Sequence, residues 1–433
     1  MKSAFYFKMI IALFSFGLFG VNAVAQYASG TGTKSDPYLI ETAEQFYKIR
    51  DNRGAYYKLM ANLDFKDYNP SDREDWWPIG EYGSGPGASD RFSGTFDGNG
   101  HKIMNLTAVS DIAKNYHDYS IFGVVEGGSI VNLIIENCVI VGGGRLGILT
   151  GETHKAVIDQ VAAINCVCTN IVTGAHAGGL LGPTYQSEVT NCYTVGGESN
   201  CFPEGADKGD AVGGIISQSD NTFVSCCYSD ITLKGKTSVG GIVGVATGGS
   251  VIMNCFAFNN DLTYIGDMRD ITNRVLGQNS GAVLEDNYAL NTVKINGSVV
   301  TERTGAETLN GQTVTLAELT QDFYETNGFF DFENVWKIDL SISEYPIFKW
   351  IESNSNSIAN TSLENDYTIS ATQGGIQISG LVGGETISLY DLTGTLLEHI
   401  NANNSTTELS ANKGIYLIRI SIRENAKTIK FIK

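Results

Sequence analysis

Two aspartates stand at matching places in neighbouring segments of this 433-residue chain. Asp230 opens Asp230-Ile231-Thr232-Leu233, and Asp261 opens Asp261-Leu262-Thr263-Tyr264, 31 residues later. If the chain repeats with that period, the two carboxylates stack roughly 5 Å apart, close to the separation used by retaining glycosidases. Such a pair can also share a calcium ion, and repulsion between the two charges raises the pKa of one carboxyl group. The alternative is two solvated strand-edge residues in imperfect register.

Aromatic side chains in the long polar segment 66–90 are a second candidate site. Trp76, Trp77 and Tyr82 carry rings that can stack on sugars, and long insertions often carry binding sites.

The sequence gives no support to the common metalloprotease, serine hydrolase, nucleotide-binding or zinc-site motifs. The sequence contains no His-Glu-x-x-His, Gly-x-Ser-x-Gly, phosphate-loop or Cys-x-x-Cys pattern. Gly142 to Gly147 matches Gly-x-Gly-x-x-Gly, but no helix-forming stretch follows, so it predicts a turn. We expect His101 and His176 at solvated turns.

A repeat of about 30 residues organises the middle of the chain. Glycine-punctuated apolar segments begin at Gly147, Gly179, Gly214 and Gly241, spaced by 32, 35 and 27 residues. Fifty glycines and short β-branched runs favour strands over amphipathic helices. The pattern predicts an all-β fold, a right-handed parallel β-helix, in which each short coil stacks on the next at roughly 4.8 Å.

A second series predicts which side chains face inward. Its members each follow an aliphatic residue by three positions: Leu133, Val161, Cys192, Cys227, Cys255 and Asn287. Equivalent positions of stacked coils form ladders, so we expect these residues to lie in one row inside the solenoid. The next residues along, Tyr193, Tyr228, Phe256 and Tyr288, then form a parallel aromatic row.

The two ends of the solenoid differ in pattern. Residues 36–51 predict a cap made of a short strand and a helix whose Thr42 and Gln45 have capping-box spacing. The repeat weakens after Asn287, and we expect the last coil and a C-terminal cap to end near Trp350. The predicted domains are residues 26–350 for the β-helix, 351–361 for a linker rich in Ser and Asn, and 362–433 for a small antiparallel β-sandwich.

Residues 1–25 read as a secretory signal peptide, because two lysines precede the apolar run Met9 to Val21 and Ala23-Val24-Ala25 resembles a cleavage site. No later segment is long and apolar enough to predict an integral membrane span. The net charge of −18 disfavours nucleic acid and anionic lipid as partners. It permits weak calcium binding, although solubility alone explains it. No other cofactor is expected.

Eight cysteines in an exported chain raise the question of disulfides. Five of them, Cys138, Cys166, Cys192, Cys227 and Cys255, fall at strand positions that suit a small apolar side chain. A bond between adjacent coils is geometrically possible. We favour mostly free, buried thiols.

Several segments resemble the GLUG-motif β-helix proteins of secreted bacterial chains. The resemblance is carried by the Gly-Leu-Leu-Gly and Gly-Ile-Val-Gly segments, by Phe96 to Ile103 with Asn105-Leu106, and by Trp77-Pro78-Ile79-Gly80. It spans about residues 30–350 and implies an adhesin-like surface protein without a transferable catalytic motif. The resemblance also implies that Trp77 lies in the core of the cap. That leaves Trp76 and Tyr82 as the surface residues that bind a glycan.

The tail is similar to the C-terminal sorting domain of the type IX secretion system in Bacteroidota. The matching residues are Ile387 to Gly394, Lys413 to Ile420 and Lys430 to Lys433, whereas Glu364-Asn365-Asp366 replaces the usual Asn-Pro. This resemblance implies the type IX export machinery as a partner.

The sequence as a whole therefore predicts a secreted or outer-membrane cell-surface protein that binds an extracellular glycan or another surface component. A polysaccharide lyase or glycoside hydrolase, and a passive structural role, remain the alternatives.

Overall fold

A computed structural model describes residues 27–68, 76–80, 90–109, 119–172, 175–201, 211–265 and 271–351, and most of 368–432. Within that last range, residues 373–374, 382–384, 391–395, 403, 412–414 and 423–424 are not described. The predicted signal peptide, most of the predicted linker and Tyr82 therefore lie outside the described residues. The chain divides into two compact units, one ending at Phe330 and one beginning at Asp331.

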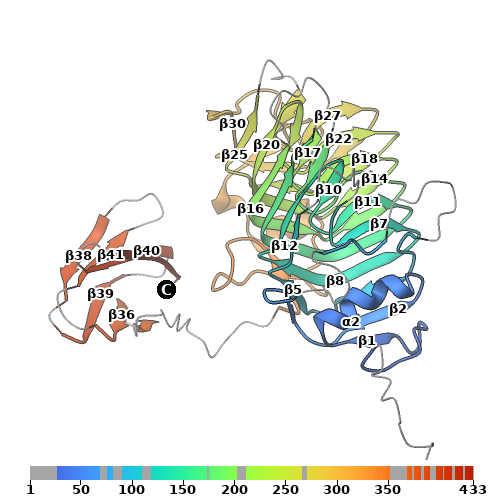
Figure 1. Ribbon diagram of the computed structural model, residues 1–433. Helices are drawn as coiled ribbons and strands as arrows, with labels where there is room; N and C mark the ends of the chain where they lie inside the picture. Colours follow the sequence, from blue (N-terminus) through green and yellow to red (C-terminus); the bar gives the residue numbers. More distant parts are fainter. Residues whose placement is uncertain are drawn as a thin grey trace, which may run out of the picture. The chain divides into compact units, whose positions relative to one another are not determined.

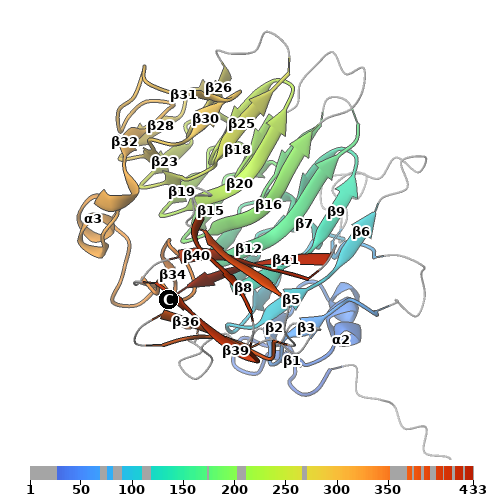
Figure 2. The same cartoon turned by 90° about the vertical axis from the view of Figure 1, so that its left-hand side faces the viewer.

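The first unit is a parallel β-helix, which confirms the predicted fold (Figure 1, Figure 2). One side is a six-stranded parallel sheet of β7 (Phe122–Glu126), β11 (Thr150–His154), β14 (Thr184–Tyr185), β18 (Ile216–Asp220), β22 (Val243–Thr247) and β27 (Leu276–Ser280). Another is a five-stranded parallel sheet of β10 (Arg145–Gly147), β13 (His176–Gly178), β17 (Ala211–Gly213), β21 (Ser238–Gly240) and β26 (Thr272–Asn273).

The remaining strands of this unit join one long sheet that continues around a corner of each coil. Its members are β1 (Tyr38–Ile40), β2 (Tyr56–Leu59), β3 (Leu63–Asp64), β4 (Thr95–Asp97), β5 (Lys102–Met104), β6 (Thr107–Val109), β8 (Ser129–Glu136), β9 (Val139–Gly142), β12 (Val157–Asn170), β15 (Glu188–Thr190), β16 (Tyr193–Cys201), β19 (Phe223–Ser225), β20 (Tyr228–Gly235), β23 (Val251–Met253), β24 (Phe256–Ala257), β25 (Asp261–Tyr264), β28 (Val283–Glu285), β29 (Tyr288–Leu290), β30 (Lys294–Ile295), β31 (Ser298–Val299) and β32 (Gln312–Val314).

The predicted inward ladder is confirmed. All six of its side chains are fully buried: Leu133, Val161, Cys192, Cys227, Cys255 and Asn287. The backbone N–H of Cys192 points at Sγ of Cys227, 3.4 Å away on the next coil. Asn287 ends the row, because its Oδ1 accepts from the Cys255 N–H at 3.1 Å and its Nδ2 donates to the Ile252 carbonyl at 2.7 Å.

The predicted aromatic row is confirmed as well. The ring centroids of Tyr193 and Tyr228 lie 4.8 Å apart, and those of Phe256 and Tyr288 lie 4.9 Å apart, which is the spacing of stacked strands. All four side chains of the row are buried. At one end it is covered by helix α3 (Gln321–Asn327), whose Tyr324 ring lies 5.0 Å from that of Phe256.

A left-handed residue turns the chain directly before each ladder residue. Its φ lies between 48° and 56° at Asn132, Gln160, Asn191, Cys226, Asn254 and Asp286. Asparagine tolerates this conformation better than most residues, which explains its recurrence here. Its side chain also links coils: Nδ2 of Asn132 donates to Oδ1 of Asp97 at 3.0 Å, and Nδ2 of Asn191 donates to Asp159 at 2.8 Å.

The glycine segments form the corner between the five-stranded and six-stranded sheets. Gly147, Gly178, Gly213 and Gly240 share one ladder position. The register thus aligns Gly147 with Gly178, one residue before the Gly179 that the spacing indicated. A methyl group on Gly213 would lie 1.9 Å from the Ile216 carbonyl oxygen. Close backbone approach therefore requires glycine at this corner.

The N-terminal cap matches its prediction. Thr42 and Gln45 form a capping box at the start of α2 (Ala43–Tyr47), and a 3₁₀ turn follows at Lys48–Asp51. The Phe46 ring is fully buried and lies 5.3 Å from Phe96 and 5.9 Å from Trp76, measured between centroids. The helix therefore closes the apolar interior of the first coils.

The last strand of the solenoid lies within the region predicted for the last coil and the C-terminal cap. The long sheet ends at β32, which pairs with β29 in parallel. Among the described residues, β33 (Trp336–Lys337) and β34 (Ile347–Phe348) pair with each other, antiparallel, and with no strand of the solenoid. Asp331 and Asp339 accept backbone N–H groups and hold tight turns in this region, and the predicted end of the β-helix and its cap near Trp350 stays a prediction.

The second unit ends in an antiparallel sandwich, as predicted. One sheet contains β35 (Thr368–Ala371), β36 (Gly375–Ser379) and β39 (Thr406–Ser410), and the other contains β38 (Leu396–Asn401), β37 (Thr386–Tyr390), β40 (Ile415–Ile422) and β41 (Asn425–Ile432). Their shared core is aliphatic: Ile369, Ile376, Ile378, Leu381, Ile387, Leu389, Ala402, Leu409, Ile418 and Ile420. The α-helices of the described ranges have five and seven residues, too few to cross a bilayer.

Candidate functional site

The structure separates the two aspartates that the sequence brought together. The register places Leu233 opposite Leu262, so that Asp261 is level with Thr232. Asp230 lies opposite Val195 on the preceding coil. The coil between the two strands is therefore shorter than their 31-residue separation, and the predicted stacking of Asp230 on Asp261 does not occur.

Each aspartate has its own surroundings instead. Asp261 Oδ1 accepts the backbone N–H of Gly297 at 3.1 Å, and Lys294 occupies the neighbouring ladder position. Among the described residues, no group of three or more His, Cys, Asp and Glu side chains is arranged to hold a metal ion. Asp230 and Asp261 are therefore not placed as a carboxylate pair that could hydrolyse a glycoside or share a calcium ion.

Trp76 is a core residue, which corrects the expectation of a surface-exposed ring. Its side chain is 4% exposed, and its Nε1 donates to the Ser120 carbonyl at 3.2 Å. The ring packs 5.6 Å from Phe65 and 5.7 Å from Tyr47, so neither face is open to a sugar. Trp77, expected in the core, is only half-buried. Tyr82 lies outside the described residues.

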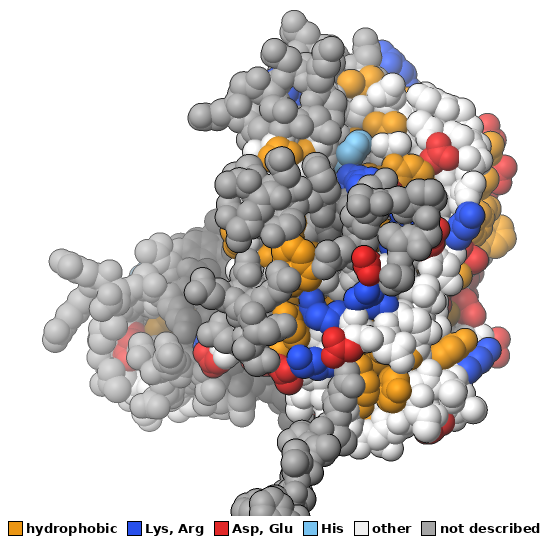
Figure 3. Space-filling model, turned by 45° about the vertical axis from the view of Figure 1, so that its right-hand side comes forward, with side chains coloured by type: hydrophobic (Ala, Val, Ile, Leu, Met, Phe, Trp, Pro, Cys, Tyr) orange, Lys and Arg blue, Asp and Glu red, His pale blue; other side chains and the backbone are white. Residues whose placement is uncertain are grey.

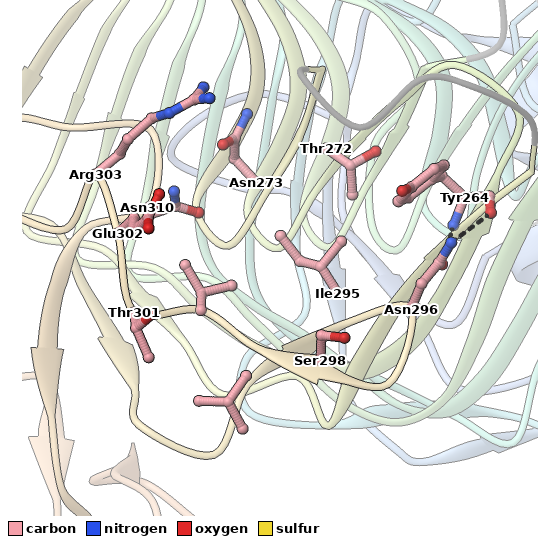
Figure 4. Close-up of a pocket in the computed structure, with 12 residues that line it drawn as sticks. Tyr264, Thr272, Asn273, Ile295, Asn296, Ser298, Thr301, Glu302, Arg303 and Asn310 are labelled. Atoms are coloured by element: carbon pink, nitrogen blue, oxygen red, sulfur yellow. Dashed lines mark hydrogen bonds between the residues drawn. The ribbon is translucent and has the colours of Figure 1, made fainter.

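A different site is open at the far end of the solenoid. A polar cleft of about 440 Å³ lies among the ends of β25 and β26, the hairpin β30–β31 and the segment after it (Figure 4). Its lining is Tyr264, Thr272, Asn273, Ile295, Asn296, Ser298, Val299, Val300, Thr301, Glu302, Arg303 and Asn310. The volume falls within the range of small-molecule sites.

Three buried polar side chains line this cleft. Thr272 is 2% exposed, and its hydroxyl has no hydrogen-bond partner in the protein. Asn273 and Asn310 are each 5% exposed, and their amides are fixed by bonds to the Gly277 carbonyl and from the Arg274 N–H. A buried hydroxyl without a partner is costly, and a polar ligand or water in the cleft would satisfy it.

The aromatic side chain of Tyr264 and the charged side chains of Glu302 and Arg303 also line the cleft. Two hydrogen bonds join the Tyr264 backbone to the Asn296 side chain. The Tyr264 N–H donates to Oδ1 of Asn296 at 2.9 Å, and Nδ2 of Asn296 donates to the Tyr264 carbonyl at 3.0 Å. Figure 4 shows Tyr264 and Thr272 at one end and Glu302, Arg303 and Asn310 at the other. The lining therefore offers hydroxyl, amide, carboxylate and guanidinium groups and one aromatic ring. Such a lining suits a polyhydroxylated ligand.

Sequence reasoning missed this cleft because its residues come from segments without a recognisable motif. Asp261-Leu262-Thr263-Tyr264 was singled out for its aspartate, whereas the residue that reaches the cleft is Tyr264. The available signal was the weakening of the repeat after Asn287. A solenoid whose coils shrink at one end leaves polar loops there that no further coil covers.

The comparisons with known proteins are limited in extent. No family model matches the chain. A protein of Evansella cellulosilytica named "Putative Gly-rich membrane protein" is 33% identical over 142 residues, which are 31% of this chain and 15% of that protein. Halomucin of Haloquadratum walsbyi is 26% identical over 172 residues, 39% of this chain and 2% of that protein. The matches therefore span a small part of both curated relatives.

Similar solved structures share the solenoid. One, titled a "putative immunoglobulin A1 protease" from Bacteroides ovatus, aligns with a TM-score of 0.56 and 24% identity over 76% of this chain and 96% of that chain. Another, titled "IgA1 Protease", aligns with a TM-score of 0.47 and 18% identity over 63% of this chain and 21% of that chain. The likeness to the Bacteroides ovatus protein shows that the two chains have a common β-helix fold.

Proposed function

We propose that the protein is a secreted or surface-displayed β-helix protein that binds an extracellular glycan in the cleft beside Tyr264. The observation that carries this proposal is the buried Thr272 hydroxyl, which has no protein partner and lines a cleft rich in amides and hydroxyls. Sugars present many hydroxyl groups and one apolar ring face. The Asn and Thr side chains match the hydroxyls, and the Tyr264 ring matches the face.

Export to the cell surface is part of the proposal. It is supported by the signal-like residues 1–25 and by the tail, which resembles a type IX sorting domain and has the antiparallel sandwich expected of such a domain. The GLUG resemblance agrees with an adhesin-like role. A rigid solenoid can hold the residues of such a cleft in a fixed arrangement.

The first test is glycan binding by the purified full chain. The protein is screened against immobilised host and plant polysaccharides, and binding of the best ligand is then measured by calorimetry for wild type and Tyr264→Ala. We expect the substitution to weaken binding about tenfold or more, the equivalent of about 1.4 kcal/mol. Phe223→Ala, which truncates a ring 38% exposed on the side of the solenoid, is the matched control and should leave binding unchanged.

Two outcomes would contradict the proposal. One is equal loss of affinity in both variants, which would place the contact elsewhere. The other is a folded protein that binds no polymer in the screen. The size distribution of each polymer is followed in the same samples, so that cleavage is recorded separately from binding.

A further inference from the structure

A buried carboxylate lies between a guanidinium and an imidazole at the corner between the five-stranded and six-stranded sheets of the solenoid. Glu152, on β11, is 3% exposed. Arg145, which begins β10, forms an ion pair with its Oε2, and Nε2 of His154 lies 2.6 Å from its Oε1. The Arg145 and His154 side chains keep 24% and 26% of their surfaces exposed. The corner thus has a buried acid and two solvent-accessible partners.

The next coil completes the group. Tyr185 lies opposite His154 in the register, and its ring stacks on the imidazole with centroids 4.7 Å apart and an interplanar angle of 13°. His176, expected at a solvated turn, instead begins β13 opposite Arg145. Its Nδ1 is buried without a hydrogen-bond partner. Burial, followed by the charge of Arg145, lowers the pKa of His176 to about 4, so this imidazole is neutral near pH 7.

The bond to Glu152 fixes how His154 presents its ring. With Nε2 directed at the carboxylate, Nδ1 is the nitrogen left to exchange a proton with a ligand. A carboxylate that orients an imidazole is the arrangement by which proteins hold a general base in the correct tautomer. The side of the molecule that includes the six-stranded sheet carries both basic and acidic side chains (Figure 3).

We propose that Arg145, Glu152, His154 and Tyr185 form a proton-transfer site that cleaves uronate-containing polysaccharides by β-elimination. This activity is separate from glycan binding in the end cleft. A hydrolytic site of the two-carboxylate type needs a second carboxylate facing the first. One candidate, Glu126, lies opposite His154 in the ladder but is paired with Arg91. Another, Asp220, lies opposite Tyr185 but accepts from the Thr247 hydroxyl. One base, one phenol and one guanidinium are the groups that elimination next to a carboxylate uses.

The proposed step balances without an added reagent. Arg145 faces the uronate carboxylate and stabilises the negative charge that develops beside it. Nδ1 of His154 takes the proton from the carbon next to that carboxylate, and the electron pair forms a carbon–carbon double bond. The neighbouring carbon–oxygen bond breaks, and the leaving oxygen takes a proton from the Tyr185 hydroxyl. Water returns a proton to Tyr185 and removes one from His154.

The test uses the full chain with alginate, polygalacturonate and hyaluronan. Elimination creates a double bond conjugated with the carboxylate, which absorbs ultraviolet light, so product appears as rising absorbance. We expect His154→Gln and Tyr185→Phe each to lower kcat by about 100-fold or more with little change in KM, because both groups act on the transferring proton. His101→Gln, a half-buried histidine directly before β5, is the matched control and should keep wild-type activity.

Thermal melting of each variant shows whether it is folded, and Tyr185→Phe preserves the ring that stacks on His154 should His154→Gln be unstable. Three results would overturn the proposal. They are no absorbance change with any of the three polymers, new reducing ends without absorbance, which means hydrolysis, and an active His154→Gln.

Discussion

At the scale of single residues, Arg274 shows how the solenoid ends. It follows Asn273, which closes the corner row of glycines, and its guanidinium is fully buried. Its N–H groups donate to the carbonyl oxygens of Asn310 at 2.9 Å and Gly311 at 3.1 Å, and to the Thr313 hydroxyl at 2.9 Å, all in the last coil, and to the Leu290 carbonyl of the coil before it at 3.3 Å. Burial lowers its pKa to about 10, so it stays protonated at neutral pH. The Arg274 side chain thus supplies hydrogen-bond donors to backbone carbonyl groups at the end of the solenoid.

Arg274→Ala should therefore destabilise the first unit by about 3 kcal/mol, because it leaves several buried carbonyl groups without donors. Arg274→Lys should recover part of the loss, since an ammonium keeps the charge but cannot reach as many oxygens as the planar fork. Thermal and urea unfolding at pH 7 measure both. A loss below about 1 kcal/mol for the alanine variant would mean that water satisfies these carbonyls equally well.

His176 predicts how stability changes with pH. Its folded pKa of about 4 lies below the ordinary 6.5, chiefly through burial and then through Arg145, with Glu152 acting in the opposite direction. The unfolded chain therefore binds the proton more readily. The contribution of His176 to the free energy of unfolding is complete above pH 6.5, falls between pH 6.5 and pH 4, and is lost below pH 4.

His176→Gln should flatten that part of the stability profile by about 1–2 kcal/mol, a value reduced for the partial exposure of the ring. The measurement is the unfolding free energy of both proteins at several pH values from 4 to 8. Parallel profiles for the two proteins would show that His176 does not sense this acid range.

At the scale of elements, each coil is set by a left-handed residue followed by an inward one. Cys226 is the cysteine of the left-handed row, with φ at 53°, where other coils place asparagine, glutamine or aspartate. Its Sγ makes only long contacts, such as 3.4 Å to the Ser225 hydroxyl. Its neighbour Cys227 belongs to the inward ladder and is fully buried.

Asparagine at these two adjacent positions should have opposite effects. We expect Cys226→Asn to stabilise the solenoid by about 0.5–1 kcal/mol, because asparagine prefers the left-handed conformation. Cys227→Asn should destabilise it by about 2 kcal/mol or more, because it places an amide in an apolar row. The melting temperature of each variant, compared with that of the wild type, measures these effects. A lower melting temperature for Cys226→Asn would show that the contacts of the thiol outweigh the backbone preference of asparagine.

The sequence predicted this element pattern well because a period of about 30 residues fixes which positions recur. Leu133, Cys192 and the aromatic row stand where the spacing put them. The exact register was not predictable, because loops of different length shift neighbouring coils. That shift separates Asp230 from Asp261 and moves the glycine row from Gly179 to Gly178.

The burial of Trp76 was not predicted for another reason, since polar sequence around a tryptophan does not reveal that the ring turns inward. The cleft beside Tyr264 and the corner at Glu152 depend on contacts between coils.

At the scale of the whole molecule, the fold decides the chemistry of its eight cysteines. All of them are free thiols in the first unit, and Cys226 alone is less than fully buried. Burial raises the pKa of Cys168 to about 12 and that of Cys226 to about 11, so neither carries much of the reactive thiolate near pH 8. Such thiols can stay reduced even in an oxidising compartment, because oxidants cannot reach them while the coils stay stacked.

Titration with an aromatic disulfide reagent at pH 8 tests this. We expect fewer than one thiol to react within minutes in the native protein and all eight after unfolding without reductant, because the coils protect the row only as a stack. Cys226→Asn should remove the slow native reaction, since that thiol is the most accessible. Two or more fast thiols in the native state would mean that the coils open locally. Fewer than eight after unfolding would mean that adjacent coils, such as those of Cys192 and Cys227, become cross-linked once the protein is made.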